Sequence, residues 1–218
     1  TICLLARQTL EAATSLDERT AVIALIDYGA GNVGSVRKAV EYLGFPSQVV
    51  SSPHALESAD KIILPGQGHF GSMLTAVADR GLLDALKRKI AAGTPYLGIC
   101  LGLQALYEAS EEAPGVAGLG ILRGTVTRFK ALEKVPQIGW NQLQIRRGSR
   151  LLQFVKDGSF AYYCHSFYGP DVPEAIAVTE YGETYATGIE KNNVYAVQFH
   201  PEKSGEVGLK VLRNFLEL

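Results

Sequence analysis

Hydrophobic and polar residues form two different patterns along this chain. In the first half, short apolar runs of strand length alternate with segments whose apolar residues recur at helical spacing. The predicted strands are 22–27, 47–50, 61–64 and 95–99, and the predicted helices are 35–43, 71–80 and 82–92. Such alternation predicts a mostly parallel sheet with helices on both faces.

After about residue 120 the segments become short and rich in β-forming residues, with Gly, Asn and Asp between them. The expected strands are 121–129, 138–145, 160–164, 175–179, 184–190 and 194–199. The last segment, 205–217, repeats Val207, Val211 and Phe215 every four residues and predicts an amphipathic helix. We therefore expect an α/β protein with a β-rich second half.

A glycine-rich turn, IDYGAGNVGS at 26–35, follows the first predicted strand and contains GxGxxG at Gly29, Gly31 and Gly34. This motif can bind a dinucleotide, but such a site needs an acidic residue about 20 positions further on to hold the ribose. The corresponding region, SQVVSSP, contains no carboxylate, which argues against an NAD-dependent oxidoreductase. A tight structural turn and a close approach to some other group remain as explanations.

Cys100 lies between Gly98 and Gly102 in LGICLGLQ, directly after a buried strand and before a helix. This is the pattern of a nucleophile elbow, in which the glycines permit a sharp turn that presents the side chain above the sheet edge. A helix N-terminus also favours the thiolate form of cysteine. The alternative is an ordinary buried cysteine.

A cysteine nucleophile requires an imidazole and a group that orients it. His200 and Glu202 in AVQFHPEKSG follow another apolar run, and Pro201 restricts the backbone between them. Without Cys100 they would be a strand-end histidine and a surface carboxylate. The other histidines, His54, His69 and His165, are weaker candidates.

A second glycine-rich strand end, LPGQGHFG at 64–71, could supply backbone N–H donors for an oxyanion. An ordinary turn explains this motif equally well when it is considered alone. Gly66, Gln67 and Gly68 would provide one donor, and the N–H of Leu101 a second.

The formal net charge of −1 offers no electrostatic case for nucleic acid or an anionic membrane, and the basic cluster RRGSR is expected to be a solvated loop. Three scattered cysteines and the lack of CxxC argue against disulfides and zinc, and favour a cytoplasmic location.

No apolar run is long enough to span a bilayer. Residues 1–20 lack the features of a secretory signal and are interpreted as an N-terminal extension of unknown role, ahead of a domain at 21–218.

Taken together, the motifs GICLGLQ and FHPE resemble those of class I glutamine amidotransferases. DYGAGN, LPGQGHFG, GWN at 139–141, HSF at 165–167 and FHPEKSG narrow the resemblance to the HisH family, the glutaminase subunits of imidazole glycerol phosphate synthase. The resemblance runs from about Val22 to the last residue. It implies a flavodoxin-like amidotransferase fold, no cofactor or metal, and a glycine turn that belongs to the site and interface side of the sheet.

The family implies that this chain hydrolyses glutamine and passes ammonia to a (β/α)8-barrel cyclase, a HisF-like partner in a heterodimer, for histidine biosynthesis. By this resemblance Cys100, His200 and Glu202 form the triad. The implied oxyanion region is Gly66, Gln67, Gly68 and Leu101; the implied glutamine contacts are Gln104, His165, Ser166 and Phe167; the implied interface residues are Asn32, Trp140 and Lys203.

Three positions depart from the family pattern. Gln67 stands where Val is frequent, Gln137 where His is common, and Phe167 where Tyr is common. Two alternatives compete with this interpretation: an amidotransferase of another pathway, such as anthranilate, GMP or pyridoxal phosphate synthesis, and a catalytically silent relative. DYGAGN and GWN argue against the first, and the complete triad argues against the second.

Overall fold

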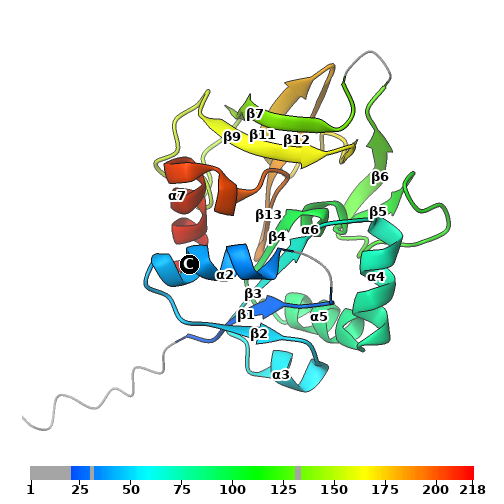
Figure 1. Ribbon diagram of the computed structural model, residues 1–218, viewed down its shortest axis with the longest axis vertical. Helices are drawn as coiled ribbons and strands as arrows, with labels where there is room; N and C mark the ends of the chain where they lie inside the picture. Colours follow the sequence, from blue (N-terminus) through cyan, green and yellow to red (C-terminus); the bar gives the residue numbers. More distant parts are fainter. Residues whose placement is uncertain (1–20, 30–31, 131–133) are drawn as a thin grey trace, which may run out of the picture.

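The computed structural model describes residues 21–29, 32–130 and 134–218, and eight strands of these residues form the central sheet (Figure 1). Five strands run parallel in the order β2 (Ser47–Val50), β1 (Ile23–Ile26), β3 (Lys61–Gly66), β4 (Tyr96–Cys100) and β13 (Val194–Val197). Antiparallel strands β12 (Glu183–Lys191), β11 (Ala175–Tyr181) and β8 (Gln144–Ile145) extend it.

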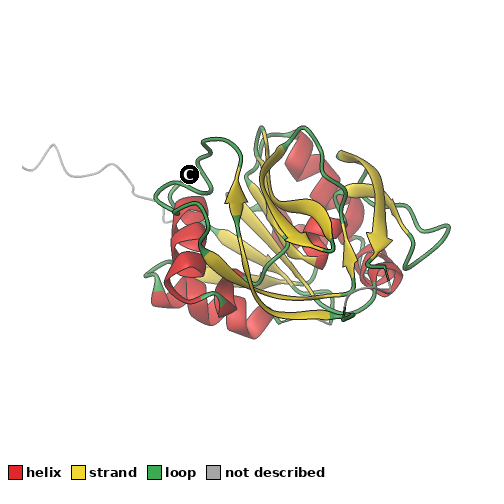
Figure 2. Ribbon diagram, turned by 90° about the horizontal axis from the view of Figure 1, so that it is seen from above, coloured by secondary structure: helices red, strands yellow, loops and turns green. Residues whose placement is uncertain are grey.

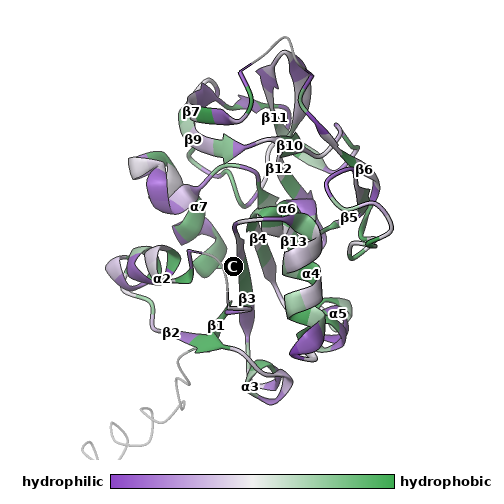
Figure 3. Cartoon of the chain, turned by 45° about the vertical axis from the view of Figure 1, so that its right-hand side comes forward, coloured by the Kyte–Doolittle hydropathy of each residue, from purple (hydrophilic) through white to green (hydrophobic). Residues whose placement is uncertain are grey.

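Helices cover both faces of this sheet (Figure 2). Ile23 and Leu25 belong to a hydrophobic cluster with α2 (Val33–Tyr42) and α7 (Gly205–Leu216), whereas Ala24 and Ile26 face α4 (Phe70–Asp79) and α5 (Leu82–Ala91). The alternation of buried residues along β1 thus builds two cores, one on each face. α5 and α7 each carry hydrophobic and hydrophilic stretches, as expected for helices that pack by one side (Figure 3).

Two smaller sheets lie beside the large one. β6 (Leu122–Arg128) pairs with β5 (Tyr107–Ser110) and β10 (Phe167–Tyr168), and β7 (Gln137–Gln142) pairs with β9 (Phe160–His165). The β7–β9 pair lies near β11 and β12, at the end of the molecule opposite α3 (Pro53–Glu57) (Figure 1). This arrangement places β-rich elements over the carboxyl edge of the parallel strands.

The predicted fold class is confirmed, and the boundaries mostly agree. α2 begins at Val33, two residues earlier than predicted, and 138–145 divides into β7 and β8. The helix expected directly after Cys100 is the short α6 (Leu101–Gln104). The short elements α3, β5 and β10 were not predicted, because two to five residues give too little periodicity to recognise. The interpretation of 1–20 as an extension concerns residues outside the described ranges and stays a prediction.

Among the described helices, none is both long and apolar enough to pass through a bilayer.

The turn from β4 into α6 depends on glycines that leave no room for a side chain. A Cβ on Gly102 would lie 2.1 Å from the carbonyl oxygen of Leu64, and one on Gly98 would lie 2.4 Å from the carbonyl oxygen of Gly102. A Cβ on Gly66 would lie 2.5 Å from the Cβ of Leu101. The backbone of α6 is therefore packed directly on β3 and β4, and this contact holds Cys100 at the sheet edge.

We predict that Gly102→Ala destabilises the protein on the order of 3 kcal/mol, because the added methyl group meets backbone that cannot rotate away. Gly34→Ala is the matched control. No atom lies within 4 Å of a Cβ built at Gly34, which is in α2, and the helix propensity of Ala should stabilise it by up to about 1 kcal/mol. Urea unfolding of both variants measures the difference; equal stabilities would contradict the packing argument.

Candidate active site

Cys100 is the last residue of β4 and the N-cap of α6, and its backbone is strained. Its φ of 54° lies in the left-handed region, which residues other than glycine rarely adopt. Backbone strain of this kind is typical of functional sites. Leu101 is the first helical residue, so its N–H has no partner within the helix. The strained turn thus presents a sulfur and a backbone donor at the same edge of the sheet.

His200 and Glu202 lie at the carboxyl end of β13, the strand next to β4 in the sheet. The Nδ1 atom of His200 is 3.0 Å from Oε1 of Glu202, and the two side chains are only 5% and 1% exposed. Burial lowers the pKa of His200, but hydrogen bonds to Cys100 and Glu202, together with their charges, outweigh it and raise the pKa to about 10. The ring therefore carries a proton that it can give to a leaving group.

Asn32, predicted as an interface residue, lies against the carboxylate of Glu202. It is the N-cap of α2, but its side chain makes no capping bond. Its Nδ2 instead donates to Oε1 of Glu202 at 3.3 Å. The other oxygen of Glu202, Oε2, is buried without a hydrogen-bond partner. Glu202 is thus oriented from two sides by contacts to one oxygen.

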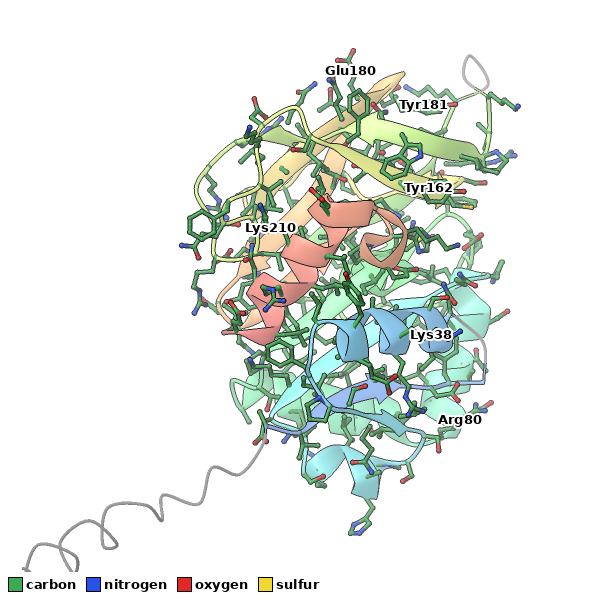
Figure 4. The ribbon with its side chains drawn as sticks, turned by 60° about the vertical axis from the view of Figure 1, so that its left-hand side comes forward. Lys38, Arg80, Tyr162, Glu180, Tyr181 and Lys210 are labelled. Atoms are coloured by element: carbon green, nitrogen blue, oxygen red, sulfur yellow. The ribbon has the colours of Figure 1, made fainter. Side chains whose placement is uncertain are left out.

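The glycine-rich turn at 26–35, which contains GxGxxG, adjoins the site, because Tyr28 and Asn32 within it contact Gln67 and Glu202. Gly29 has a φ of 87°, which favours glycine, whereas the nearest atom to a Cβ there, Nη2 of Arg80 at 2.5 Å, ends a flexible side chain that can move. Figure 4 labels Arg80 on the side of the molecule where α2 lies. Gly31 lies outside the described residues. Since Gly34 has open space around it, the motif lacks the close helix–strand packing that its third glycine serves in dinucleotide folds.

The predicted oxyanion residues lie at the end of β3: Gly66 is its last residue, and Gln67 and Gly68 follow. All three line the same cavity as Cys100 and Leu101. β3 extends two residues beyond the predicted end, and Gly66 pairs with Cys100 across the sheet. The N–H of Gln67 donates to the hydroxyl of Tyr28 at 3.1 Å. This N–H is therefore engaged by Tyr28.

Two side-chain amides, those of Gln104 and Gln198, connect the backbone of Phe167 to the sulfur of Cys100. Nε2 of Gln104 donates to the carbonyl of Phe167 at 2.8 Å and to Oε1 of Gln198 at 3.1 Å. Nε2 of Gln198 lies 3.5 Å from the sulfur of Cys100. Because both amide hydrogens of Gln104 are engaged, only its Oε1 remains to contact a ligand. Gln198, which adjoins FHPE and is fully buried, was not predicted from the sequence.

His165 is buried behind the site in a neutral form. Its Nδ1 is 2.8 Å from the carbonyl of Phe167, so Nδ1 carries the hydrogen. Burial is the main reason that the pKa of His165 falls to about 4, and the charge of His200 lowers it further. The hydroxyl of Tyr185 lies 3.4 Å from Nε2 of His165 and donates to Gln137 at 2.9 Å. Gln137 therefore fills, as a neutral acceptor, the place where the family commonly has histidine.

A cavity of about 400 Å³ opens above Cys100 and His200. Its remaining lining residues are Gly66, Gln67, Gly68, Leu101, Gln104, Glu112, Pro136, Cys164, His165, Ser166, Phe167 and Lys203. Glu112, which was not predicted from the sequence, brings a carboxylate whose Oε2 accepts the N–H of Phe70 at 2.7 Å. No group of three or more His, Cys, Asp or Glu residues in the described ranges could hold a metal ion.

Trp140 and Lys203 lie on an exposed surface next to the cavity. Trp140 on β7 is 56% exposed, and its ring centroid is 6.1 Å from that of Tyr162 on β9. The Nζ of Lys203 lies 5.8 Å from the centre of the same tyrosine ring. Tyr162 is labelled in Figure 4, with α7 between it and α2. Ile138, 61% exposed, adds to this apolar surface.

The cavity, elbow and histidine–carboxylate pair define a cysteine-dependent hydrolase or transferase site on a doubly wound sheet. A sequence model described as "Glutamine amidotransferase class-I" matches residues 24–218. Solved structures have the same fold. A crystal structure of a glutamine amidotransferase superimposes with a TM-score of 0.71 at 20% sequence identity, and the match covers 89% of this chain and 97% of the other. PurLQS from Thermotoga maritima has the same TM-score and identity, with 91% and 98% covered.

Similarity to individual proteins is higher. The imidazole glycerol phosphate synthase subunit HisH of Methanothermobacter thermautotrophicus is 48% identical over 90% of this chain and 98% of the relative. HisH of Methanocaldococcus jannaschii is 44% identical over 90% and 100%, and a HisH of Thermus thermophilus is 47% identical over 86% and 93%. The chain therefore belongs to the HisH family of class-I glutamine amidotransferases.

We predict that His165 makes the protein sensitive to acid. Its pKa is about 4 in the folded state and about 6.5 in the unfolded chain. Between these values the unfolded chain binds a proton that the native protein does not, so stability is lost as pH falls from 6.5 towards 4. His165→Asn keeps a donor for Phe167 but cannot titrate.

Between pH 7 and pH 4.5, wild type should lose about 2 kcal/mol more unfolding free energy than His165→Asn. Urea unfolding at both pH values gives this difference. His54→Asn, which changes an exposed histidine on α3, should retain the full wild-type loss. Identical acid dependence in wild type and His165→Asn would show that the buried histidine is protonated without cost.

Proposed function

We propose that Cys100, His200 and Glu202 hydrolyse glutamine to glutamate and ammonia, as the glutaminase subunit of imidazole glycerol phosphate synthase in histidine biosynthesis. The observation that carries this proposal is the buried 3.0 Å pair of His200 and Glu202 beside a strained cysteine elbow. It is supported by the similarity of the chain, over about nine-tenths of its length, to subunits named HisH. We also propose a cytoplasmic location, for which the pattern of cysteine usage is the support.

In the first half-reaction, the thiolate of Cys100 attacks the carboxamide carbon of glutamine, and a C–S bond forms as the carbonyl electrons move to oxygen. The N–H of Leu101 and a backbone N–H of the Gly66–Gly68 segment donate to this oxyanion. The intermediate collapses, the C–N bond breaks, and protonated His200 transfers its proton to the leaving ammonia. Glutamyl thioester remains on Cys100.

In the second half-reaction, neutral His200 accepts a proton from water as the water oxygen attacks the thioester carbon. The C–S bond then breaks, and glutamate leaves with the thiolate restored. Glu202 holds the Nδ1–H of His200, so that Nε2 can face the reacting atoms. Asn32 supports this orientation through its bond to Glu202.

Substrate recognition requires groups for an α-ammonium and an α-carboxylate. Glu112 contributes negative charge to the cavity and suits the ammonium. We assign the carboxylate and backbone contacts to the 165–167 segment. The carbonyls of Ser166 and Phe167 are already engaged by the N–H of Phe129 and by His165 and Gln104, so this segment has N–H groups rather than carbonyls to offer.

We propose that the ammonia passes to a cyclase subunit of (β/α)8-barrel fold, because the relatives are named as subunits of a synthase. Ammonia must travel uncharged and shielded from water, because protonation removes its lone pair. The exposed surface of Ile138, Trp140 and Lys203 beside the cavity suits such a docking face, since exposed aromatic residues often dominate binding energy.

We expect Cys100→Ser to abolish glutamine-dependent synthesis by the assembled complex and to spare synthesis from added ammonium salt at high pH. The reason is that Cys100 forms only the acyl-enzyme. Glutamate release is measured with and without the purified, liganded cyclase. The cyclase should stimulate glutamate release by wild type at least ~100-fold, because one missing oxyanion donor costs roughly that much in rate. Cys164→Ser, at the exposed cysteine of the cavity, is the control. Full glutaminase activity in Cys100→Ser would refute the assignment.

Lys203→Ala should retain glutamine hydrolysis but loosen its coupling to synthesis, because Lys203 lies at the rim where ammonia leaves. Trp140→Ala should weaken both association and coupling. The measurement is moles of glutamate formed per mole of imidazole glycerol phosphate, with the cyclase saturating. Lys87→Ala, which changes an exposed lysine on α5 in the opposite layer, should keep the wild-type ratio. The same ratio in Lys203→Ala would make Lys203 an ordinary surface residue.

A further inference from the structure

Tyr28 is a buried tyrosine, 2% exposed, that follows β1 and makes two hydrogen bonds to a single residue of the oxyanion segment. Its hydroxyl accepts the N–H of Gln67 at 3.1 Å and donates to the carbonyl oxygen of Gln67 at 3.3 Å. One hydroxyl group therefore engages both backbone polar groups of this residue. Since an N–H group points in one direction, the Gln67 N–H held by Tyr28 is not available to an oxyanion on Cys100.

The surrounding backbone is built so that this peptide can turn while its neighbours stay fixed. Gly66 is packed against Leu101 and Gly102, and it has no Cβ to oppose rotation of the peptide that follows it. Gly68 has a φ of 93°, and apart from its chain neighbours no atom lies within 4 Å of the place that a Cβ would occupy. Rotation of the Gly66–Gln67 peptide thus requires that the N–H bond to Tyr28 breaks at the point where β3 ends.

The environment keeps Tyr28 in its hydrogen-bonding form. Burial raises the pKa of Tyr28, the bond to Gln67 lowers it, and the nearby charge of Cys100 raises it again. The phenol therefore retains its hydrogen at neutral pH and can donate to the Gln67 carbonyl.

We propose that Tyr28 is a positioning residue that holds the Gln67 amide away from the oxyanion hole in the free chain. Activation of the site then requires the Gln67 N–H to exchange Tyr28 for the substrate oxyanion. This inference rests on the proposed glutaminase function. It also gives the DYG turn a purpose: the left-handed Gly29 lets the chain turn directly after Tyr28, so that its ring can reach the end of β3.

The test is Tyr28→Phe, which removes the hydroxyl and keeps the ring. A net hydrogen bond corresponds to a factor of roughly two to ten in an equilibrium. The basal glutaminase kcat of the isolated variant should rise about three- to tenfold with the KM for glutamine unchanged, and the stimulation by the cyclase should fall by the same factor. A basal kcat that is unchanged or lower would overturn the proposal, and a lower one would show that Tyr28 supports the donor orientation instead.

Tyr107→Phe is the matched control, because it removes another buried tyrosine hydroxyl, bonded to the Pro170 carbonyl away from the cavity. It should leave basal kcat unchanged. Alkylation of Cys100 by iodoacetamide needs no oxyanion donor, so its rate should be equal in wild type and Tyr28→Phe. A parallel rise in alkylation and hydrolysis would overturn the proposal in favour of a general opening of the site.

A measurement on wild type avoids any folding defect of the variant. In the 15N-labelled free chain, the Gln67 amide should exchange with solvent at least tenfold more slowly than that of an exposed residue such as Gly148. Fast exchange in the free chain would refute the bond to Tyr28. Failure of the proposed function is distinguishable, because wild type would then release no glutamate even with cyclase.

Discussion

Direct backbone contact between α6 and the ends of β3 and β4 is the constraint on which the site depends. Three glycines, Gly66, Gly98 and Gly102, allow this approach, and none of them has space for a methyl group. The contact forces Cys100 into a left-handed conformation that its side chain disfavours. Packing around the turn must supply the stability that offsets this strain. The position of the sulfur is therefore determined by backbone packing rather than by contacts of the cysteine itself.

The turn after β1 contacts two separate parts of the candidate site. Tyr28, at its beginning, hydrogen-bonds Gln67, and Asn32, at its end, donates to Glu202, the partner of His200. Both contacts join residues far apart in the chain, and both lie at the carboxyl edge of the sheet, where open α/β folds bind their ligands. A change in this turn would consequently reach the Gln67 backbone and the His200–Glu202 pair together.

Polar groups behind the cavity are paired with each other and leave few free atoms for a ligand. Gln104, Gln198 and Phe167 form one connected set, and His165, Tyr185 and Gln137 form another. Such networks rigidify a site because breaking one bond leaves a buried group unsatisfied. The substitution of Gln137 for the family's histidine is accommodated within this network, since the Gln137 oxygen accepts the Tyr185 hydroxyl.

Local sequence patterns predict the order of strands and helices along the chain, the elbow at Cys100 and the pairing of His200 with Glu202. These patterns need no knowledge of contacts between distant residues. Glycines flanking a cysteine after an apolar run, or a proline between two polar residues, restrict the backbone through their own geometry. Tyr28, Gln198 and Glu112 carry no such local signal, because each gains its role from a partner far away in sequence. The interface role predicted for Asn32 stays a prediction, and the bond of its amide to Glu202, 170 residues away, carries no local signal either. Folding alone brings these groups together, since the parallel sheet gathers the carboxyl ends of β1, β3, β4 and β13 at one edge.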